Sequence, residues 1–141
     1  MPTSVKPTPE TYGPLLPISL YAAAKLSEEA LISAYCNGFG IQGFIFRFAN
    51  IVGPGLTHGV IYDFVEKLRK NPRELEVLGD GRQRKSYTYV TDCISGMLTG
   101  VEKMTDTVNV ANISTDDTTP VMGIAEETVK RVAPGAKVKC T

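Results

Sequence analysis

The sequence is poor in the residues that build metal centres. Its 141 residues include a single histidine, His58, and three widely separated cysteines with no C-x-x-C pair. A structural zinc site needs four thiolate or imidazole ligands, so we expect no metal site. A sparse, odd number of cysteines is typical of a reducing cytoplasm. Cys36 and Cys93 fall in helical patterns, where a free cysteine packs as a small core residue.

An excess of charge and long apolar segments are also missing. Fifteen basic residues balance fifteen acidic ones, whereas nucleic-acid-binding proteins usually have a basic surplus. No apolar run reaches the ~18 residues that cross a bilayer, and no charged stretch followed by an apolar one forms a leader. We therefore expect a cytoplasmic protein that binds neither nucleic acid nor membranes. A chain of this length can bury the core of one domain.

Helical and extended patterns alternate along the first third of the chain. Five prolines in residues 1–17 predict an extended lead-in. Leu20–Cys36 is predicted to be a helix, with Ser19 as its N-cap and Asn37-Gly38 as its stop. The run at 41–48 is β-branched, aromatic and mostly apolar, which predicts a strand buried on both faces in a parallel sheet.

The alternation continues through the rest of the chain. We expect a loop over 49–59, helices over 60–70, from 91 and from 120, and strands at 74–78, 87–90 and 107–112. Thr91 is the expected cap of the middle helix, whose Ile94, Met97, Leu98 and Val101 share one face. Thr119 is the expected cap of the last helix, with Pro120 in its first turn. The tail after residue 132 has no stop signal of its own. Helices that alternate with apolar strands predict an α/β fold.

Tyr21 and Lys25 are the most informative pair in the predicted first helix. Four residues apart, they lie one turn from each other on one face, with three alanines between them that leave room for a flat ligand. A free tyrosine, with a pKa of ~10, is a poor base at neutral pH, but a nearby ammonium stabilises a phenolate. Such a pair can take a proton from a sugar hydroxyl while a nicotinamide takes hydride from the same carbon. By spacing alone, an exposed tyrosine beside a solvated lysine fits as well.

Four sequence blocks give this pair a context. They are LPISLYAAAKLSEEALISAY, FIFRFANIVGPG, HGVIYDFVEKL and LEVLGDGRQRKSYTYVTDC. From about Pro7 to about Val132, they resemble in order and spacing the extended short-chain dehydrogenases, closest to UDP-glucose 4-epimerases and their NAD-dependent epimerase/dehydratase relatives. The resemblance implies NAD as cofactor and a UDP-sugar as substrate. It also implies the end of a Rossmann-like dinucleotide-binding domain over 1–58 and part of a nucleotide-sugar-binding region, with a returning strand and helix, over 59–141.

The resemblance also assigns roles to individual residues. Tyr21 matches the catalytic base and Lys25 its partner, both of them in contact with the cofactor, and the main chain at Phe48 passes the nicotinamide. Substrate contacts fall on Asn50, Val60, Arg84 and Lys85. The family commonly has arginine at the diphosphate-binding position held here by Lys85, and lysine cannot offer a bidentate fork, so Arg84 next to it is the alternative.

Plainer interpretations of several residues stay open. Asn50 also suits a turn, and the basic residues around Lys85 also suit a solvated turn. His58 is interpreted as a loop residue because the family's proton chemistry runs through tyrosine. Tyr87 and Tyr89 in a basic strand raise RNA stacking as a possibility that the neutral net charge disfavours.

A Gly-x-x-Gly-x-x-Gly turn, whose amides would cradle the cofactor pyrophosphate, does not occur in the sequence. No catalytic serine is identifiable either, Ser4 being the nearest candidate. The chain therefore resembles an enzyme truncated at both ends, and we expect negligible epimerase activity from it alone. The strand at 41–48 would then expose an edge that is inclined to pair with another chain.

Partners and alternative functions follow from the same resemblance. The expected partner is a second copy, bound through the helix of Tyr21, or a missing N-terminal half. The alternative functions are a nucleotide-sugar dehydratase or reductase, and a non-catalytic α/β module for binding or assembly.

Overall fold

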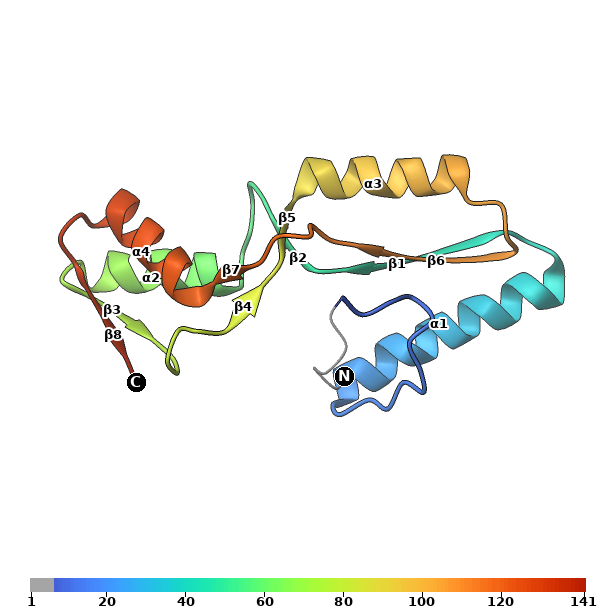
Figure 1. Ribbon diagram of the computed structural model, residues 1–141, viewed down its shortest axis with the longest axis horizontal. Helices are drawn as coiled ribbons and strands as arrows, with labels where there is room; N and C mark the ends of the chain where they lie inside the picture. The colour runs from blue at the N-terminus through green and yellow to red at the C-terminus, as the bar shows by residue number, and fades with distance from the viewer. Residues whose placement is uncertain (1–6) are drawn as a thin grey trace. The chain divides into compact units, whose positions relative to one another are not determined.

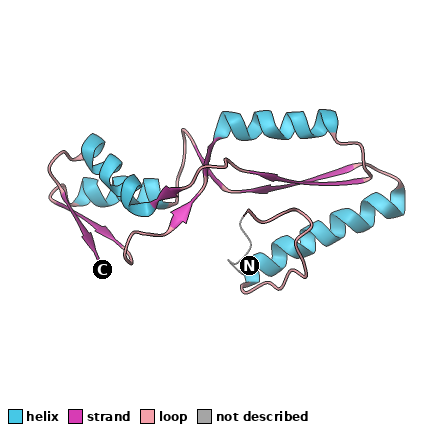
Figure 2. Ribbon diagram, viewed as in Figure 1, coloured by secondary structure: helices cyan, strands magenta, loops and turns pink. Residues whose placement is uncertain are grey.

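The computed structural model describes residues 7–141, so Ser4 lies outside the described residues. The chain divides by its contacts into two units, coloured along the chain in Figure 1 and by secondary structure in Figure 2. The first unit contains the residues up to Phe48 and Cys93–Ile113. The second unit contains Ala49–Asp92 and Ser114–Thr141. The α/β class predicted from the sequence is confirmed.

The first unit is built around two parallel strands. Strand β1 (Gly43–Phe48) pairs with β6 (Val108–Ile113) in a register that joins Gly43 to Val108 and Phe48 to Ile113. Helix α1 (Leu20–Phe39) and helix α3 (Val90–Lys103) lie on opposite sides of this pair (Figure 1). The predicted returning strand and helix therefore pack with the predicted first helix and strand.

Glycines bring both helices close to β1. A Cβ at Gly43 would lie 2.4 Å from Sγ of Cys36 in α1, and a Cβ at Gly100 in α3 would lie 2.8 Å from the ring of Phe46. Gly43 and Phe46 point to opposite faces because side chains alternate along a strand. The side chains of Cys36 in α1 and Cys93 in α3 are both buried, which confirms both as small core residues.

The edges of this sheet are open. In the part of the chain that the structure describes, β1 and β6 pair only with each other, so each keeps one unpaired edge. The prediction that β1 exposes an edge is therefore confirmed. The prediction that β1 is buried on both faces is wrong, because Ile45 is the only residue of β1 that is buried. Helices cover its faces, but no further strands among residues 7–141 complete the core around it.

The second unit contains six short strands and two helices. They are β2 (Asn50–Val52), α2 (Val60–Lys70), β3 (Glu74–Val77), β4 (Arg84–Lys85), β5 (Tyr87–Tyr89), β7 (Thr119–Pro120), α4 (Val121–Val132) and β8 (Lys137–Cys140). Strand β2 pairs with β5 and β3 with β8, both in parallel, while β4 pairs with β7 antiparallel. Its core joins α2 and α4 to β3 through Phe64, Leu68, Leu75, Val77, Ala125 and Val129.

Three helix ends differ from the predicted ones. Helix α1 is capped by Ser19 as predicted, whose Oγ accepts from the Ala22 amide at 3.1 Å. It continues through Asn37-Gly38 to Phe39, however, because Gly40 supplies the left-handed conformation, with φ 65°. Helix α3 starts at Val90, so Thr91 lies inside it. Thr119 does not cap α4, because it is paired in β7 and Pro120 takes the N-cap position.

Four strands were missed, namely β2, β4, β7 and β8, and one helix face was wrongly assigned. Asn50–Val52 was predicted to be loop but forms β2, and the tail forms β8 alongside β3. Both depend on partners far away in the sequence. In α3, Ile94, Leu98 and Val101 are exposed, whereas Cys93 is buried, because the face toward the strands is made of small residues.

Within residues 7–141, no helix is long and apolar enough to cross a membrane. The same residues contain no group of three or more histidine, cysteine or acidic side chains that could hold a metal ion.

Candidate functional site

Tyr21 and Lys25 lie in the first turns of α1, where the predicted spacing holds. The Lys25 ammonium is 5.9 Å from the centre of the Tyr21 ring. Tyr21 is 74% exposed, and the alanines between the two residues leave no bulky side chain beside them. Both polar groups are therefore open to a ligand.

Glu28 is the immediate partner of Lys25. The Lys25 ammonium donates to the Glu28 carboxylate at 2.8 Å, one turn further along α1. The hydrogen bond from Lys25 to Glu28, and then the charge of that carboxylate, raise the pKa of Lys25 above its ordinary value. Lys25 is therefore a cation at neutral pH, and a ligand on Tyr21 would compete with Glu28 for it.

Arg47 connects α1 to the carboxyl end of β1. Its guanidinium donates through Nε and a terminal nitrogen to both oxygens of Glu29 in α1, at 2.9 and 2.6 Å. The hydrogen bonds to Glu29 raise the pKa of Arg47 further above its ordinary value. A third donation reaches the Glu10 carbonyl at 3.1 Å. Arg47 thereby connects β1 both to α1, the helix that carries Tyr21, and to the lead-in at Glu10.

The lead-in is also tied to β6. The Glu10 carboxylate accepts from the Asn112 amide at 2.9 Å, and the Asn112 side chain donates to the Thr8 carbonyl at 2.9 Å. The hydrogen bond from the Asn112 amide is the main cause that lowers the pKa of Glu10. Phe48, 49% exposed, ends β1 in the same unit. The unit thus carries Tyr21, Lys25 and Phe48 of the predicted site.

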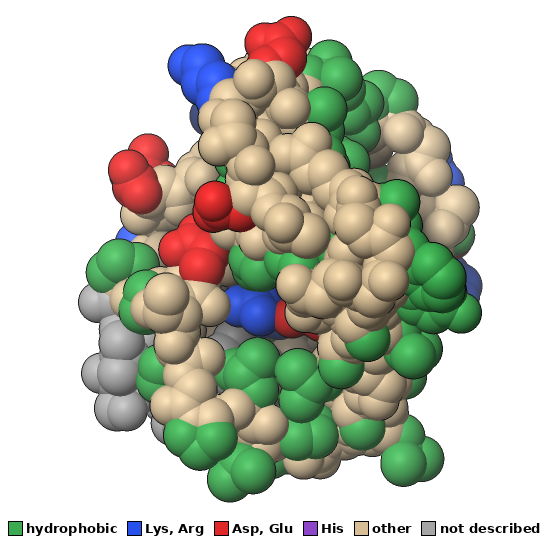
Figure 3. Space-filling view, turned by 90° about the vertical axis from the view of Figure 1, so that its right-hand side faces the viewer, with side chains coloured by type: hydrophobic (Ala, Val, Ile, Leu, Met, Phe, Trp, Pro, Cys, Tyr) green, Lys and Arg blue, Asp and Glu red, His purple; other side chains and the backbone are tan. Residues whose placement is uncertain are grey.

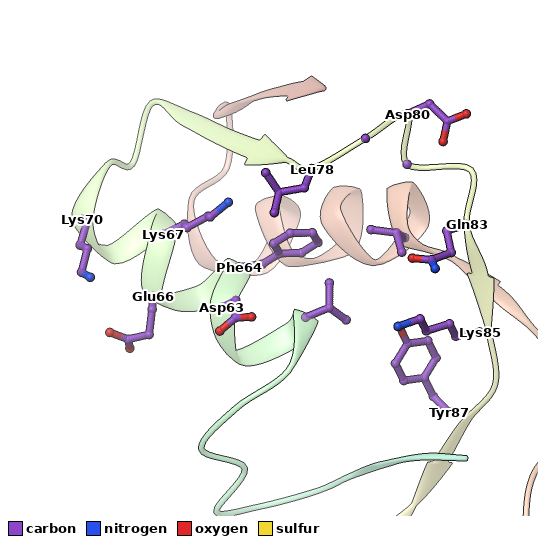
Figure 4. A pocket seen from close by; sticks show the side chains of 14 residues that line it. Asp63, Phe64, Glu66, Lys67, Lys70, Leu78, Asp80, Gln83, Lys85 and Tyr87 are labelled. Carbon is purple, nitrogen blue, oxygen red and sulfur yellow. The ribbon is translucent and has the colours of Figure 1, made fainter. Parts of the chain in front are cut away.

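The second unit contains a pocket of about 560 Å³. Figure 4 shows side chains from α2, from the turn after β3 and from the β4–β5 segment around it. Its lining residues are Val60, Asp63, Phe64, Glu66, Lys67, Lys70, Leu78, Gly79, Asp80, Gly81, Gln83, Lys85, Tyr87 and Val121. The size is within the range of small-molecule sites, and the mixture of apolar wall and charged groups is typical of them. Gly79 and Gly81 both have positive φ, at 75° and 68°, which the tight turn after β3 requires.

Of the four predicted substrate contacts, two line this pocket. Val60 starts α2, and Lys85 extends from β4; the Lys85 ammonium has no hydrogen-bond or ion-pair partner among residues 7–141. Lys67 is already engaged, since its ammonium donates to the Glu76 carbonyl at 2.9 Å. Arg84 does not line the pocket, and its guanidinium donates to Thr118. Asn50 does not line it either, and its amide donates to the Ser86 carbonyl at 2.9 Å.

Tyr87 is a pocket residue that the sequence analysis considered only for RNA stacking. It follows Lys85 by two positions in the extended β4–β5 segment, and both side chains line the pocket; this spacing is the signal that could have found it. Its hydroxyl oxygen is buried without a hydrogen-bond partner in the described chain. Burial raises the pKa of the Tyr87 phenol. His58 lies outside the pocket, in the bend before α2, which agrees with its interpretation as a loop residue.

A model of the NAD dependent epimerase/dehydratase family matches residues 2–113. The chain belongs to the NAD-dependent epimerase/dehydratase family. The resemblance inferred from the four sequence blocks is thereby confirmed. Similar proteins include the uncharacterized UDP-glucose epimerase YtcB of Bacillus subtilis, 30% identical over 84% of this chain and 39% of the relative. UDP-glucuronic acid decarboxylase 1 of Arabidopsis thaliana is 33% identical over 94% of this chain and 32% of its own length.

Solved structures of this family share the fold. A UDP-galactose 4-epimerase matches 99% of this chain and 46% of its own, with 38% identity and a TM-score of 0.87. The UDP-glucose 4-epimerase of Thermotoga maritima, solved with UDP-glucose, matches with 29% identity, a TM-score of 0.79 and 46% coverage of its own chain. An NAD-dependent NDP-hexosamine 5,6-dehydratase of tunicamycin biosynthesis matches with 28% identity and a TM-score of 0.80. The chain thus spans less than half the length of the relatives it matches.

Proposed function

We propose that this chain carries the proton-transfer pair and part of the nucleotide site of an NAD-dependent UDP-sugar 4-epimerase. The observation that carries the proposal is the Tyr21–Lys25 pair, exposed on α1 with ammonium and ring centre 5.9 Å apart, in a member of this family. The epimerases among the relatives support this reaction over the others.

The proposed chemistry at α1 is removal of a proton from a sugar hydroxyl by Tyr21. The Lys25 cation stabilises the phenolate that accepts this proton. NAD, when bound, supplies the hydride acceptor for the same carbon. The exposed ends of both side chains fit a role at the nicotinamide ribose, and the main chain at Phe48, proposed to pass the nicotinamide, belongs to the same unit. For the pyrophosphate, the 141 residues offer no Gly-x-x-Gly-x-x-Gly turn.

The pocket of the second unit is the proposed nucleotide site. Phe64, Leu78 and Val121 give it apolar walls suited to a base and ribose. Lys85, which has no side-chain partner among the described residues, supplies a cation for the diphosphate. Lysine binds phosphate as a point charge, without the fixed geometry of a guanidinium. Asn50 does not line this pocket and its amide donates to the Ser86 carbonyl, so a substrate contact by Asn50 requires that this hydrogen bond be released.

Binding of the two ligands separates the nucleotide site from the cofactor site. We expect calorimetric titration of the 141-residue chain to show UDP binding and no measurable NAD binding. We also expect no turnover of UDP-galactose when NAD is added. Tight NAD binding or turnover would contradict the proposal that the chain by itself lacks the cofactor site. A chain that does not bind UDP would contradict the proposal that the pocket is a nucleotide site.

A chimera tests the role of Tyr21. Placing this chain over the matching segment of the Thermotoga maritima UDP-glucose 4-epimerase supplies the segments that the chain does not span. The proposal requires that Tyr21→Phe reduces kcat by at least ~10²-fold, as loss of a general base does, with unchanged UDP affinity. An active Tyr21→Phe chimera would favour the alternative of a non-catalytic module. Products other than the C4 epimer would favour a dehydratase or reductase.

The exposed apolar face of α1 supports a second copy of the chain as partner. Leu20, Leu31, Tyr35 and Phe39 of this helix are between 57% and 91% exposed. Hydrophobic side chains (green) form several patches on the face shown in Figure 3, between larger areas of other side chains and backbone (tan). Exposed apolar patches of this kind mark interaction sites in soluble proteins.

A further inference from the structure

Arg84 and Lys85 are neighbours with opposite surroundings. Arg84 donates through Nε to the Thr118 hydroxyl at 2.9 Å and through a terminal nitrogen to the Thr118 carbonyl. Lys85 lines the pocket and has no side-chain partner in the described part of the chain. Because consecutive side chains of a strand point to opposite faces, a held Arg84 fixes which way Lys85 points.

The backbone around this pair is fastened to the same distant segment. Strand β4 pairs with β7 so that Arg84 is opposite Pro120 and Lys85 is opposite Thr119. One residue earlier, the Gln83 carbonyl accepts from the Val121 amide at 2.9 Å. A strand of two residues has few ladder bonds of its own. The forked contact of Arg84 with Thr118, the residue before β7, is therefore the main side-chain attachment of β4 to this segment.

We propose that Arg84 is a positioning residue, whose grip on Thr118 fixes the β4 strand so that Lys85 presents its ammonium to a nucleoside diphosphate in the pocket. This inference rests on the proposed function, which makes Lys85 the diphosphate contact. Next to a phosphate site, the arginine would ordinarily be expected to contact the phosphate; here we assign that contact to the lysine. The residue with the better phosphate-binding geometry holds the strand, and the lysine meets the ligand.

The two roles for Arg84 predict different couplings with Lys85. If Arg84 contacted the diphosphate itself, the losses from removing Arg84 and Lys85 would add. If Arg84 acts through Lys85, removing Arg84 has no further effect once Lys85 is gone. A double-mutant cycle measures this difference directly.

The experiment is a calorimetric titration of UDP and of uridine into the 141-residue chain and its variants. Lys85→Ala is expected to weaken UDP binding by about 10-fold or more, as loss of a hydrogen bond to a charged group does. Arg84→Ala is expected to weaken it by about 3- to 10-fold, and Arg84→Ala in the Lys85→Ala background by less than about twofold. Uridine binding should be unchanged in all three.

Three further variants separate positioning from general damage. Thr118→Val removes the hydroxyl acceptor and should weaken UDP binding, as Arg84→Ala does. Thr118→Ser keeps the hydroxyl and should bind UDP as tightly as the unaltered chain. Arg82→Ala removes a neighbouring exposed arginine that pairs with Asp80 at 3.9 Å, and it should change nothing. Thermal unfolding of each variant identifies any that has lost its fold, and Arg84→Lys then replaces Arg84→Ala, because it keeps the charge without the fork.

Each outcome decides between the hypotheses. Additive losses in the cycle, or an Arg84→Ala variant with normal UDP affinity beside a weakened Lys85→Ala, would overturn the positioning role and leave the proposed nucleotide site intact. Lys85→Ala with unchanged UDP affinity, or a chain that does not bind UDP, would overturn the proposed site and the inference with it. Non-additive losses that spare uridine would establish Arg84 as the residue that positions Lys85.

Discussion

At the scale of single residues, the buried hydroxyl of Tyr87 is a cost that a small substitution removes. Its oxygen has no partner in the described chain, and an unsatisfied buried polar group costs about 1–3 kcal/mol. We predict that Tyr87→Phe raises the free energy of unfolding by about 1 kcal/mol, measured by urea denaturation. Tyr89→Phe, on a side chain that is 46% exposed, is the matched control and should change it by less than about 0.5 kcal/mol. A destabilised Tyr87→Phe variant would show that the hydroxyl has a partner in solution.

Residue types along the chain predict candidate side chains for chemistry, but they do not predict where each side chain points. The spatial pairing of Tyr21 with Lys25 was predictable because their relation is local, one turn of a helix that is capped by Ser19 as predicted. The choice between Arg84 and Lys85 stayed open because it depends on Thr118, more than thirty positions away. Tyr87 was misjudged for the same reason, since the pocket wall opposite it comes from α2 and α4.

At the scale of elements, the approach of α1 to β1 depends on the missing side chain of Gly43. A Cβ there would lie 2.4 Å from the Cys36 sulfur and 3.2 Å from Ile32. We predict that Gly43→Ala lowers the free energy of unfolding by about 1–3 kcal/mol, as overpacking of a core does. In the Cys36→Ala background the penalty should shrink, because the atom in the way is gone. Gly38→Ala, with no atom within 4 Å of the new methyl, should instead stabilise α1 by about 0.5–1 kcal/mol. Chemical denaturation of the four variants tests both signs.

Elements with their own local signals were predictable, and those defined by distant partners were not. The helices followed from periodicity and from caps such as Ser19. Strands β2 and β8 are three and four residues long and exist through pairing with β5 and β3. Short strands have no reliable signature of their own, because their hydrogen bonds come from elsewhere in the chain. Thr119 illustrates the conflict, since a good capping residue is used in β7.

At the scale of the whole molecule, the order of four sequence blocks predicted the family, which the family match confirms. The same order did not reveal how the units interleave. Residues 93–113 return to the first unit because β6 pairs with β1, a contact between segments more than sixty positions apart. The division into a dinucleotide-binding region over 1–58 and a nucleotide-sugar-binding region over 59–141 remains a prediction about function. The two packing units, in contrast, are each made of segments that are separate in the sequence.

Self-association is the property of the whole molecule that the exposed surface of α1 predicts. Tyr35 and Phe39 stack with their ring centres 5.4 Å apart while both remain more than half exposed. We predict that sedimentation velocity shows association that grows with concentration and that Tyr35→Glu weakens it, because burying an unpaired carboxylate is unfavourable. Tyr62→Glu, the same change on a 38% exposed tyrosine of α2, is the control and should leave association unchanged. If Tyr35→Glu associates as strongly as the unaltered chain, the contact is made elsewhere, and the unpaired edges of β1 and β6 become the surfaces to test. A chain that is monomeric at every concentration would show that neither surface binds a second copy.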